Sequence, residues 1–203
     1  MKLTSKILAF AAVATALVSA ASAASETYKI DPVHSSVCFK IRHIVGKVPG
    51  AFTKFSGTVT IDRDNMENNA CEATIEVGSL CTFNDYRDAD LKKPAYFDAE
   101  KFATITFKSK KIAPAGEGEL KITGDLTIHG VTKEVVLNAE GPTAEGKDPF
   151  GNIRIGASGS TKIKRSDFGL TYNAALETGG ILIGDDLKIE LEISAIRAVA
   201  AAA

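Results

Sequence analysis

The sequence lacks tryptophan and contains only three cysteines. Its one long apolar run lies at the amino terminus. After that run, no apolar stretch approaches the roughly 20 residues that a membrane-spanning helix needs, so we expect no membrane span in the remaining chain. An odd number of cysteines excludes a framework of paired disulfides. Cys38, Cys71 and Cys81 leave two alternatives open, one bridge in an oxidising compartment or three buried thiols.

An excess of basic residues is also missing. Removing Lys2 and Lys6 with the amino-terminal run leaves 22 of the 24 basic residues against 25 acidic ones, a net charge of about −3. This balance gives no support to binding of nucleic acid or of an anionic membrane through a broad basic face.

Catalytic signatures are absent as well. The chain has no HExxH motif, no CxxC pair and no glycine-rich phosphate-binding loop. The stretch GASGS at 156–160 resembles a nucleophile elbow, but it lacks the closing glycine and lies in a strand-like alternation. We therefore expect a protein that is not an enzyme and that uses no cofactor.

The three histidines do not form an evident metal site. His34 and His43 are nine residues apart, so in one regular strand they would lie on opposite faces and about 30 Å apart. His129 occupies a predicted turn, where a polar residue needs no further explanation. We predict three separately satisfied histidines and no metal.

The first residues have the composition of a secretory signal peptide. Lys2 and Lys6 form a basic region, residues 7–18 are apolar, and Ala21-Ser22-Ala23 matches an A-x-A cleavage site. We predict that residues 1–23 are removed and that 24–197 form one exported domain in the periplasm. The alanine-rich residues 198–203 are predicted to form a disordered tail.

The clearest local pattern is the alternation of apolar and polar residues in 119–140. Leu120, Ile122, Leu126 and Ile128 alternate with polar neighbours, and the alternation resumes after His129-Gly130. A period of two predicts strands, and a glycine that tolerates positive φ predicts a tight turn between them. Residues 119–140 are therefore predicted to form a β-hairpin.

Similar alternation predicts further strands, at 28–43, 52–61, 73–77, 102–107, 153–164 and 187–193. Eight strands separated by turn signals favour a closed antiparallel barrel or a sandwich. A ten-residue strand spans about 33 Å, which is enough for an elongated barrel. The interior of an eight-stranded barrel either packs with side chains or holds one small ligand.

Three stretches interrupt the strand pattern. Residues 84–93 lack β-branched side chains and are followed by Pro94, so they predict a short helix, about 85–93, with Asp85 as its N-cap. Residues 45–50 contain two glycines and a proline and predict a loop. Residues 166–180 predict a helical turn followed by a mobile loop.

Charged residues that alternation does not explain lie near the predicted helix and the 166–180 segment. They are Arg87, Asp88, Asp98, Arg165 and Asp167. Such charges could form ion pairs that hold the helix over one mouth of a barrel, or some of them could meet the polar end of a ligand.

These residues lie within motifs that resemble the YceI-like family, whose members are described as polyisoprenoid-binding proteins with a lipocalin-like barrel. The matching pieces are spread in order over nearly the whole chain after residue 30. They are DPVHSSV at 31–37 with Phe39 and His43, Phe52 through Phe55 to Gly57, Arg87-Asp88 with Leu91, Tyr96-Phe97-Asp98, GDLTIHGVT at 124–132, DPFG at 148–151, RSDFG at 165–169 and Ile183-Gly184-Asp185.

The resemblance implies an all-β, elongated, eight-stranded antiparallel barrel, closed on one side by the short helix, with a tunnel for a quinone or polyprenyl tail. It implies transport or storage of that lipid, without catalysis. We expect nine apolar residues to line the tunnel, namely Phe39, Ile41, Phe52, Phe55, Ile75, Ile105, Phe107, Leu126 and Phe168. His43, Arg87 and Arg165 are expected near the polar end of the ligand.

Other functions remain open at this point. A barrel filled by its own side chains could act as a stress-response or protein-interaction module through the loop at 141–150. The cysteines, which are not part of the family pattern, could support redox chemistry, and Cys38 or an exposed strand edge could support a homodimer. A membrane-protein partner that loads and unloads the lipid is also open.

Overall fold

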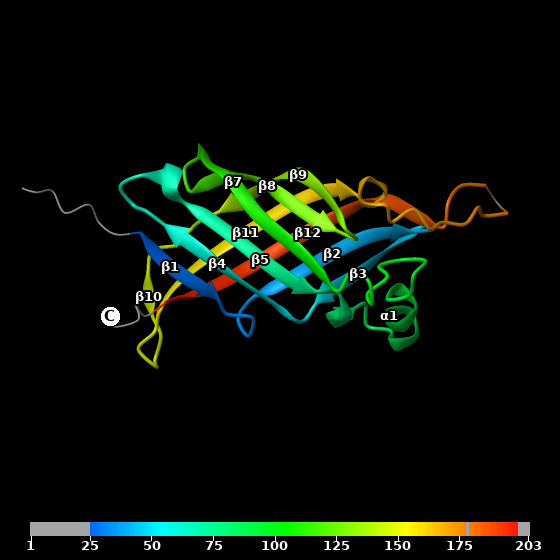
Figure 1. Ribbon diagram of the computed structural model, residues 1–203, viewed down its shortest axis with the longest axis horizontal. Helices are drawn as coiled ribbons and strands as arrows, with labels where there is room; N and C mark the ends of the chain where they lie inside the picture. Colours follow the sequence, from blue (N-terminus) through cyan, green and yellow to red (C-terminus); the bar gives the residue numbers. More distant parts are fainter. Residues whose placement is uncertain (1–24, 178, 199–203) are drawn as a thin grey trace, which may run out of the picture.

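A computed structural model describes residues 25–177 and 179–198 of the chain as an elongated antiparallel barrel (Figure 1). The predicted signal peptide at 1–23, and all but the first residue of the predicted tail, lie outside the described residues. None of the described helices has the length and apolar character needed to cross a bilayer.

The barrel is built from twelve strand segments in one sheet. They are β1 (Glu26–Ile30), β2 (Ser36–His43), β3 (Gly46–Phe52), β4 (Phe55–Ile61), β5 (Ala70–Glu76), β6 (Leu80–Cys81), β7 (Thr104–Gly116), β8 (Glu119–Ile128), β9 (Val131–Glu140), β10 (Gly146–Lys147), β11 (Ile153–Lys164) and β12 (Ile183–Arg197). The helical elements are α1 (Asp85–Leu91) and the 3-10 turns η1 (Met66–Asn68), η2 (Val77–Ser79) and η3 (Arg165–Phe168).

Several of these segments are parts of one interrupted barrel strand. β1 and β2 pair with successive parts of β12. On their other side, β1 pairs with β4 and β2 pairs with β3. β4 then pairs with β5, and β3 pairs with β6. The chain then continues through β7, β8, β9 and β11, and β11 pairs with β12 over eleven residue pairs, from Arg154 to Lys164. The ring is thereby closed, which confirms the predicted eight-stranded lipocalin-like barrel.

The predicted hairpin at 119–140 is present as β8 and β9. The two strands pair without a register shift from Glu119↔Glu140 to Ile128↔Val131. His129 and Gly130 both have positive φ, 51° and 74°, as a two-residue turn between twisted strands requires. Alternation and turn chemistry therefore predicted this hairpin correctly.

The predicted loop at 45–50 is wrong, because most of it belongs to β3. β3 pairs with β2 along its whole length, and Pro49 lies opposite Lys40. On its other side, β3 pairs with β6 only at Ala51 and Phe52 among the described residues. Pro49 therefore lies on an open strand edge, where the missing N–H costs no ladder hydrogen bond.

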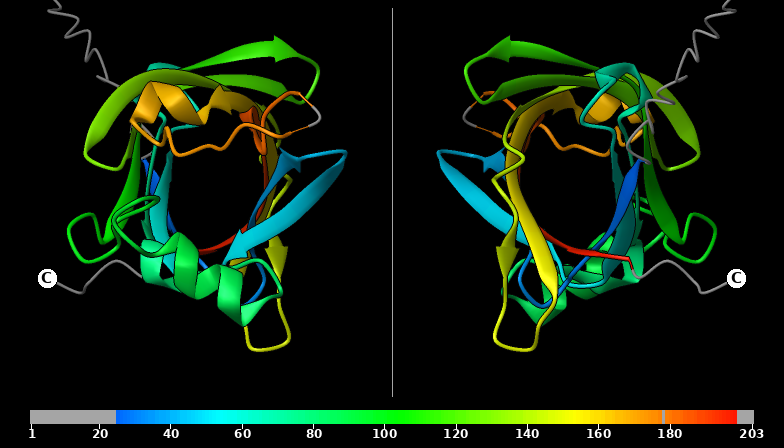
Figure 2. Two further views of the ribbon diagram at one scale, coloured as in Figure 1. Left: turned by 90° about the vertical axis from the view of Figure 1, so that its right-hand side faces the viewer. Right: turned by 90° about the vertical axis from the view of Figure 1, so that its left-hand side faces the viewer.

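α1 forms where a helix was predicted, but its N-cap is Asn84 and not Asp85. The Asn84 side chain accepts a hydrogen bond from the backbone N–H of Arg87 at 2.9 Å. The helix α1 lies at one end of the elongated barrel, and the two ends of the described chain lie together at the opposite end (Figures 1 and 2). The barrel thus has a terminal end and an α1 end.

The terminal end is filled by side chains. Tyr28, Ile61, Ile155 and Ala195 form a buried cluster there, and Tyr28 is fully buried. Outside this cluster, Arg154 joins two turns, donating through Nη1 to Asp31 Oδ2 at 2.7 Å and through Nε to Asp148 Oδ2 at 2.8 Å. The ion pairs tie the β1–β2 turn to the β10–β11 loop.

The Arg154 pairs predict a specific pH dependence of stability. The hydrogen bond from Arg154, helped by His34, lowers the pKa of Asp31 to about 2. A carboxylate whose pKa is lower in the folded chain stabilises the fold above its unfolded pKa of about 4 and loses that contribution as the pH falls toward 2. We expect Arg154→Gln to lower the midpoint of thermal unfolding at pH 7, with a difference from wild type that shrinks between pH 4 and pH 2.

The control for this variant is Lys162→Gln. Lys162 also pairs with a carboxylate, Asp186, but both side chains are more than half exposed, and such pairs contribute little. Equal effects of the two substitutions at pH 7, or a difference for Arg154→Gln that does not shrink at all between pH 4 and pH 2, would contradict the assigned role of Arg154.

Candidate ligand cavity

Between the filled terminal end and α1, the barrel encloses an apolar cavity of about 240 Å³. Inward-facing residues of β12 line it from Ile183 to Ile193. At about 3.3 Å per residue, these positions are spread over about 33 Å of strand. The cavity is therefore long and narrow, and it follows the barrel lengthwise.

All nine apolar residues predicted from the sequence lie in the wall of this cavity. They are Phe39, Ile41, Phe52, Phe55, Ile75, Ile105, Phe107, Leu126 and Phe168. They come from seven different elements. Strand alternation turns the strand residues inward while neighbours such as Lys40 and Thr74 face solvent, and Phe168 is placed in the wall by the turn η3. Their position is established by the structure, and their contact with a ligand stays a prediction.

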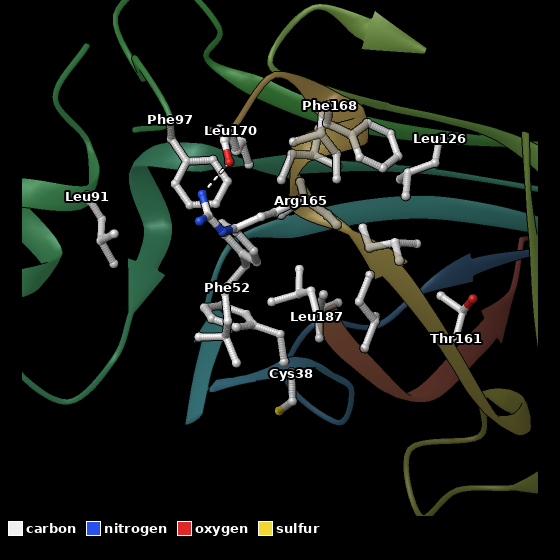
Figure 3. A pocket seen from close by; sticks show the side chains of 18 of the residues that line it. Cys38, Phe52, Leu91, Phe97, Leu126, Thr161, Arg165, Phe168, Leu170 and Leu187 are labelled. Carbon is white, nitrogen blue, oxygen red and sulfur yellow. Dashed lines mark hydrogen bonds between the residues drawn. The ribbon is translucent and has the colours of Figure 1, made fainter. Parts of the chain in front are cut away.

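Arg165, at the start of η3, places a cation in this apolar wall. Its guanidinium donates to three backbone carbonyls, those of Gly184 at 3.0 Å, Leu170, and Ile183 at 3.5 Å. Figure 3 shows the guanidinium extending toward Leu170, on the side of the cavity where Phe97 and Leu91 lie. The side chain is held in place by neutral oxygen atoms.

Arg87, on α1, is the second cation in the wall. Its Nε donates to Thr82 Oγ1 at 2.7 Å and its Nη2 to the Thr82 carbonyl at 2.6 Å. Thr82 in turn donates its backbone N–H and its hydroxyl to Asp88 Oδ1, at 2.8 and 2.5 Å. Asp88 is buried and reaches Arg87 only through Thr82.

The ion pairs that the sequence suggested for the α1 end are not formed. In the part of the chain that the structure describes, neither Arg87 nor Arg165 has a carboxylate oxygen within 4.0 Å. Asp98 and Asp167 do not line the cavity. Arg87 and Arg165 therefore lie, without a direct counter-ion, in the wall of a cavity whose surface is almost entirely apolar.

His43, the third predicted polar residue, lies at the α1 end of β2 and also lines the cavity. It is exposed and lies opposite Ile183 in the β2–β12 ladder. These positions place His43 at the mouth of the cavity.

Sequence reasoning missed a pair of tyrosines in the wall. Tyr96 and Tyr172 pack with their ring centroids 4.5 Å apart. Burial, followed by the nearby Tyr172 hydroxyl, raises the pKa of Tyr96 to about 12. Tyr96 was visible as part of a family motif, whereas Tyr172 lies in an irregular segment where no periodic pattern indicates direction.

The histidines and cysteines are dispersed. His34 contacts Asp31 at 2.7 Å, and the His129 ring packs on Phe102 with centroids 4.3 Å apart. Within 25–177 and 179–198, no group of three or more histidine, cysteine or acidic side chains is arranged to hold a metal ion. The three cysteines are free thiols, so the alternative of an intramolecular bridge is not realised.

The comparisons with known proteins agree with this architecture. The profile of the YceI-like domain matches residues 28–195, which is most of the chain. The chain belongs to the YceI-like family. A UPF0312 protein of Vibrio cholerae is 36% identical over 157 residues, which cover 77% of this chain and 82% of that protein.

Solved structures show the same fold. Burkholderia cenocepacia BcnA superposes with a TM-score of 0.70 at 25% identity, covering 81% of this chain and 98% of BcnA. A polyisoprenoid binding domain from Saccharophagus degradans, implicated in plant cell wall breakdown, has a TM-score of 0.61 at 17% identity and covers 84% and 98%. At that identity, the likeness shows the fold alone.

The YceI-like motif pieces fall into two groups in this structure. Asp31 and Asp148 form the Arg154 ion pairs at the terminal end, where they hold the barrel together. Arg165 and Phe168 line the cavity, and Gly169, with φ of 75°, ends η3 so that the chain can turn away. The motif therefore combines residues that close the fold with residues that face the cavity.

Proposed function

We propose that this protein binds one long-chain isoprenoid lipid, of the quinone or polyprenyl type, in the barrel cavity and carries it without catalysing a reaction. The observation that carries the proposal is the shape and chemistry of the cavity, which is long, narrow and apolar with two cations in its wall. An apolar cavity of about 150 Å³ is enough to remain dry and bind a benzene-sized molecule, so a cavity of this size favours an apolar ligand over water.

The dimensions favour a chain over a broad ring system. A volume of about 240 Å³ lies below the range of about 300–1,000 Å³ of ordinary small-molecule pockets, yet its wall extends along most of β12. A slender flexible tail fits such a space, whereas a haem or a flavin does not. The polyisoprenoid binding domain of Saccharophagus degradans, which has this fold, supports the isoprenoid class.

The energy of binding also favours a long tail. Each buried methylene contributes about 0.8 kcal/mol, so roughly ten of them contribute a gross 8 kcal/mol. The loss of translational and rotational freedom removes at least about 4 kcal/mol of that sum. Tight binding therefore needs a tail of several isoprene units or a recognised head group.

Arg87 and Arg165 supply the recognition of a head group. A guanidinium carries five N–H donors, and those not used by Thr82 or by the carbonyls around Arg165 can be donated to a ligand. A quinone carbonyl and a phosphate are both acceptors that a guanidinium binds well. His43 adds a third polar side chain at the mouth.

The place of action is the periplasm in this proposal, because residues 1–23 have the features of a secretory signal. The periplasm is an aqueous compartment, and an isoprenoid that crosses it between membranes or membrane proteins needs a carrier that shields its apolar tail from water. The proposal includes a membrane-protein partner that loads and unloads the lipid, and it includes no binding of nucleic acid.

Two alternatives lose support. The filled-barrel module requires an interior without a ligand-sized space, whereas the barrel contains one. Redox chemistry through Cys71 is disfavoured, because burial raises the pKa of its thiol and so disfavours the reactive thiolate.

A substitution that fills the cavity tests the binding proposal. Ala73 faces the cavity from β5, and the next residue, Thr74, faces solvent. We expect Ala73→Phe to displace about two methylenes of ligand and to weaken uptake of a polyprenyl lipid about tenfold, measured by fluorescence titration. The matched control, Thr74→Phe, adds the same side chain outside the barrel and should leave uptake unchanged. Equal affinities for the two variants would rule out the cavity as the binding site.

A second substitution tests the head group. Arg87→Met removes the donors but keeps an apolar side chain of similar length. We expect it to weaken binding of an isoprenoid with a quinone or phosphate head about 10- to 100-fold, because a hydrogen bond to a charged group contributes about 1.5–3 kcal/mol. Binding of an isoprenoid hydrocarbon without a head group should not change. A loss of the same size for both ligands would show that Arg87 acts on the shape of the cavity and not on a head group.

A further inference from the structure

The turn between β2 and β3 exposes apolar side chains at the mouth of the cavity. We call residues 42–47 the hairpin tip. Val45 is 91% exposed and Ile44 is 43% exposed. The tip projects from the α1 end of the barrel beside the segment that precedes β12 (Figure 2), and the Ile44 N–H donates to the Leu182 carbonyl at 3.0 Å.

Three features of the hairpin tip are unfavourable for the stability of an isolated hairpin. Ile44 has φ of 55°, a left-handed conformation that suits glycine or asparagine and disfavours a β-branched residue. Arg42 lies directly opposite Lys47 in the β2–β3 ladder, and like charges that face each other destabilise a strand pair. Val45 leaves its side chain in water. Such departures from local preference concentrate at functional positions.

The hairpin tip itself carries two basic side chains, Arg42 and Lys47, and no acidic one. From Pro32 to Ile61 the chain contains no acidic residue. Lys40 and Lys54 in this stretch pair with Glu190 and Glu76 of other strands, so the basic charge of the surface rests on Arg42 and Lys47. In the adjoining part of β12, Asp186 pairs with Lys162, whereas Asp185 accepts hydrogen bonds from the neutral Ser166 and keeps its negative charge. The net charge of the whole chain conceals this local basic surface.

The tip is continuous with the cavity. His43, which adjoins Ile44, lines the cavity and lies opposite Ile183, which lines it as well. Ile181, more than half exposed, lies one residue from Leu182, the partner of Ile44. Anything that contacts the tip is therefore next to the mouth.

We propose that the hairpin tip docks on an anionic phospholipid bilayer. Ile44 and Val45 enter the interfacial layer, Arg42 and Lys47 contact the lipid head groups, and the cavity mouth is thereby held at the membrane surface. Binding of a surface element to a bilayer grows with its buried apolar area and with its attraction to anionic lipids, and the tip offers both. The use of this contact for lipid exchange rests on the proposed function, whereas the contact itself does not.

The apolar part of the proposal is tested with Ile44→Asn/Val45→Ser. Asparagine tolerates the positive φ of Ile44, so this variant should fold at least as well as wild type, measured by thermal unfolding. We expect its sedimentation with phosphatidylcholine vesicles containing phosphatidylglycerol, free of isoprenoid, to weaken at least tenfold. Val33→Ser removes an equally exposed β-branched side chain outside the tip and serves as the control, with unchanged sedimentation.

The charged part is tested with Arg42→Gln/Lys47→Gln. Each basic residue near an anionic surface contributes about fivefold to partitioning, so we expect the double variant to bind about 30-fold more weakly. Lys29→Gln/Lys111→Gln removes the same charge from exposed strand positions outside the tip, and we expect less than a twofold change. Raising the ionic strength should reduce the difference between wild type and the Arg42→Gln/Lys47→Gln variant.

Failure of wild type to sediment with anionic vesicles, or equal sedimentation of tip and control variants, would overturn the proposal. These outcomes are independent of isoprenoid binding, which is measured separately in solution without vesicles. The tip variants should keep the wild-type affinity for the lipid there and should lose rate only when the lipid is supplied in vesicles. An unchanged rate from vesicles would contradict the role of the tip in exchange.

Discussion

Closure of the sheet between β11 and β12 is the constraint on which the rest of this structure depends. Eleven residue pairs complete the ring, and the ring sets how far apart the inward side chains of opposite strands lie. Alternation then assigns one face of each strand to the interior. The cavity is the space inside the ring that the inward side chains leave unfilled.

The two ends of the closed barrel differ in how their interior and their charged side chains are arranged. At the terminal end, Tyr28 fills the interior, and Arg154 joins the outer turns through two carboxylates. At the α1 end, Arg87 and Arg165 are held by hydroxyl and carbonyl oxygens without direct ion pairs. The ion pairs at the terminal end stabilise the ring, whereas the two arginines at the α1 end place positive charge in the wall of the cavity.

Much of the fold could be predicted from the sequence because the informative patterns are local. Alternation in 119–140 identified the β8–β9 hairpin, and the same period placed residues such as Phe39, Ile105 and Leu126 on the inner face. Phe168, which lies in the turn η3, was expected in the cavity wall without such a period. Whether those residues pack together or leave a cavity could not be read from alternation, because it depends on the radius of the closed ring. The family resemblance, and not the periodicity, indicated a tunnel.

The errors also have physical causes. Gly46, Pro49 and Gly50 are typical of a loop, and only the unpaired edge of β3 makes a strand possible there. The partners of Arg165 are backbone carbonyls of Leu170, Ile183 and Gly184, which no side-chain pattern reveals. Tyr172 was missed for a similar reason, since it lies outside the regular strands.

The most direct test of the central claim is the content of the cavity in the protein purified from its native host without detergent. We predict that mass spectrometry of an organic extract finds one isoprenoid lipid per chain, and that the Ala73→Phe variant prepared in the same way carries less of it. A cavity that is reproducibly empty, and that takes up neither a quinone nor a polyprenyl lipid when these are added, would contradict the account.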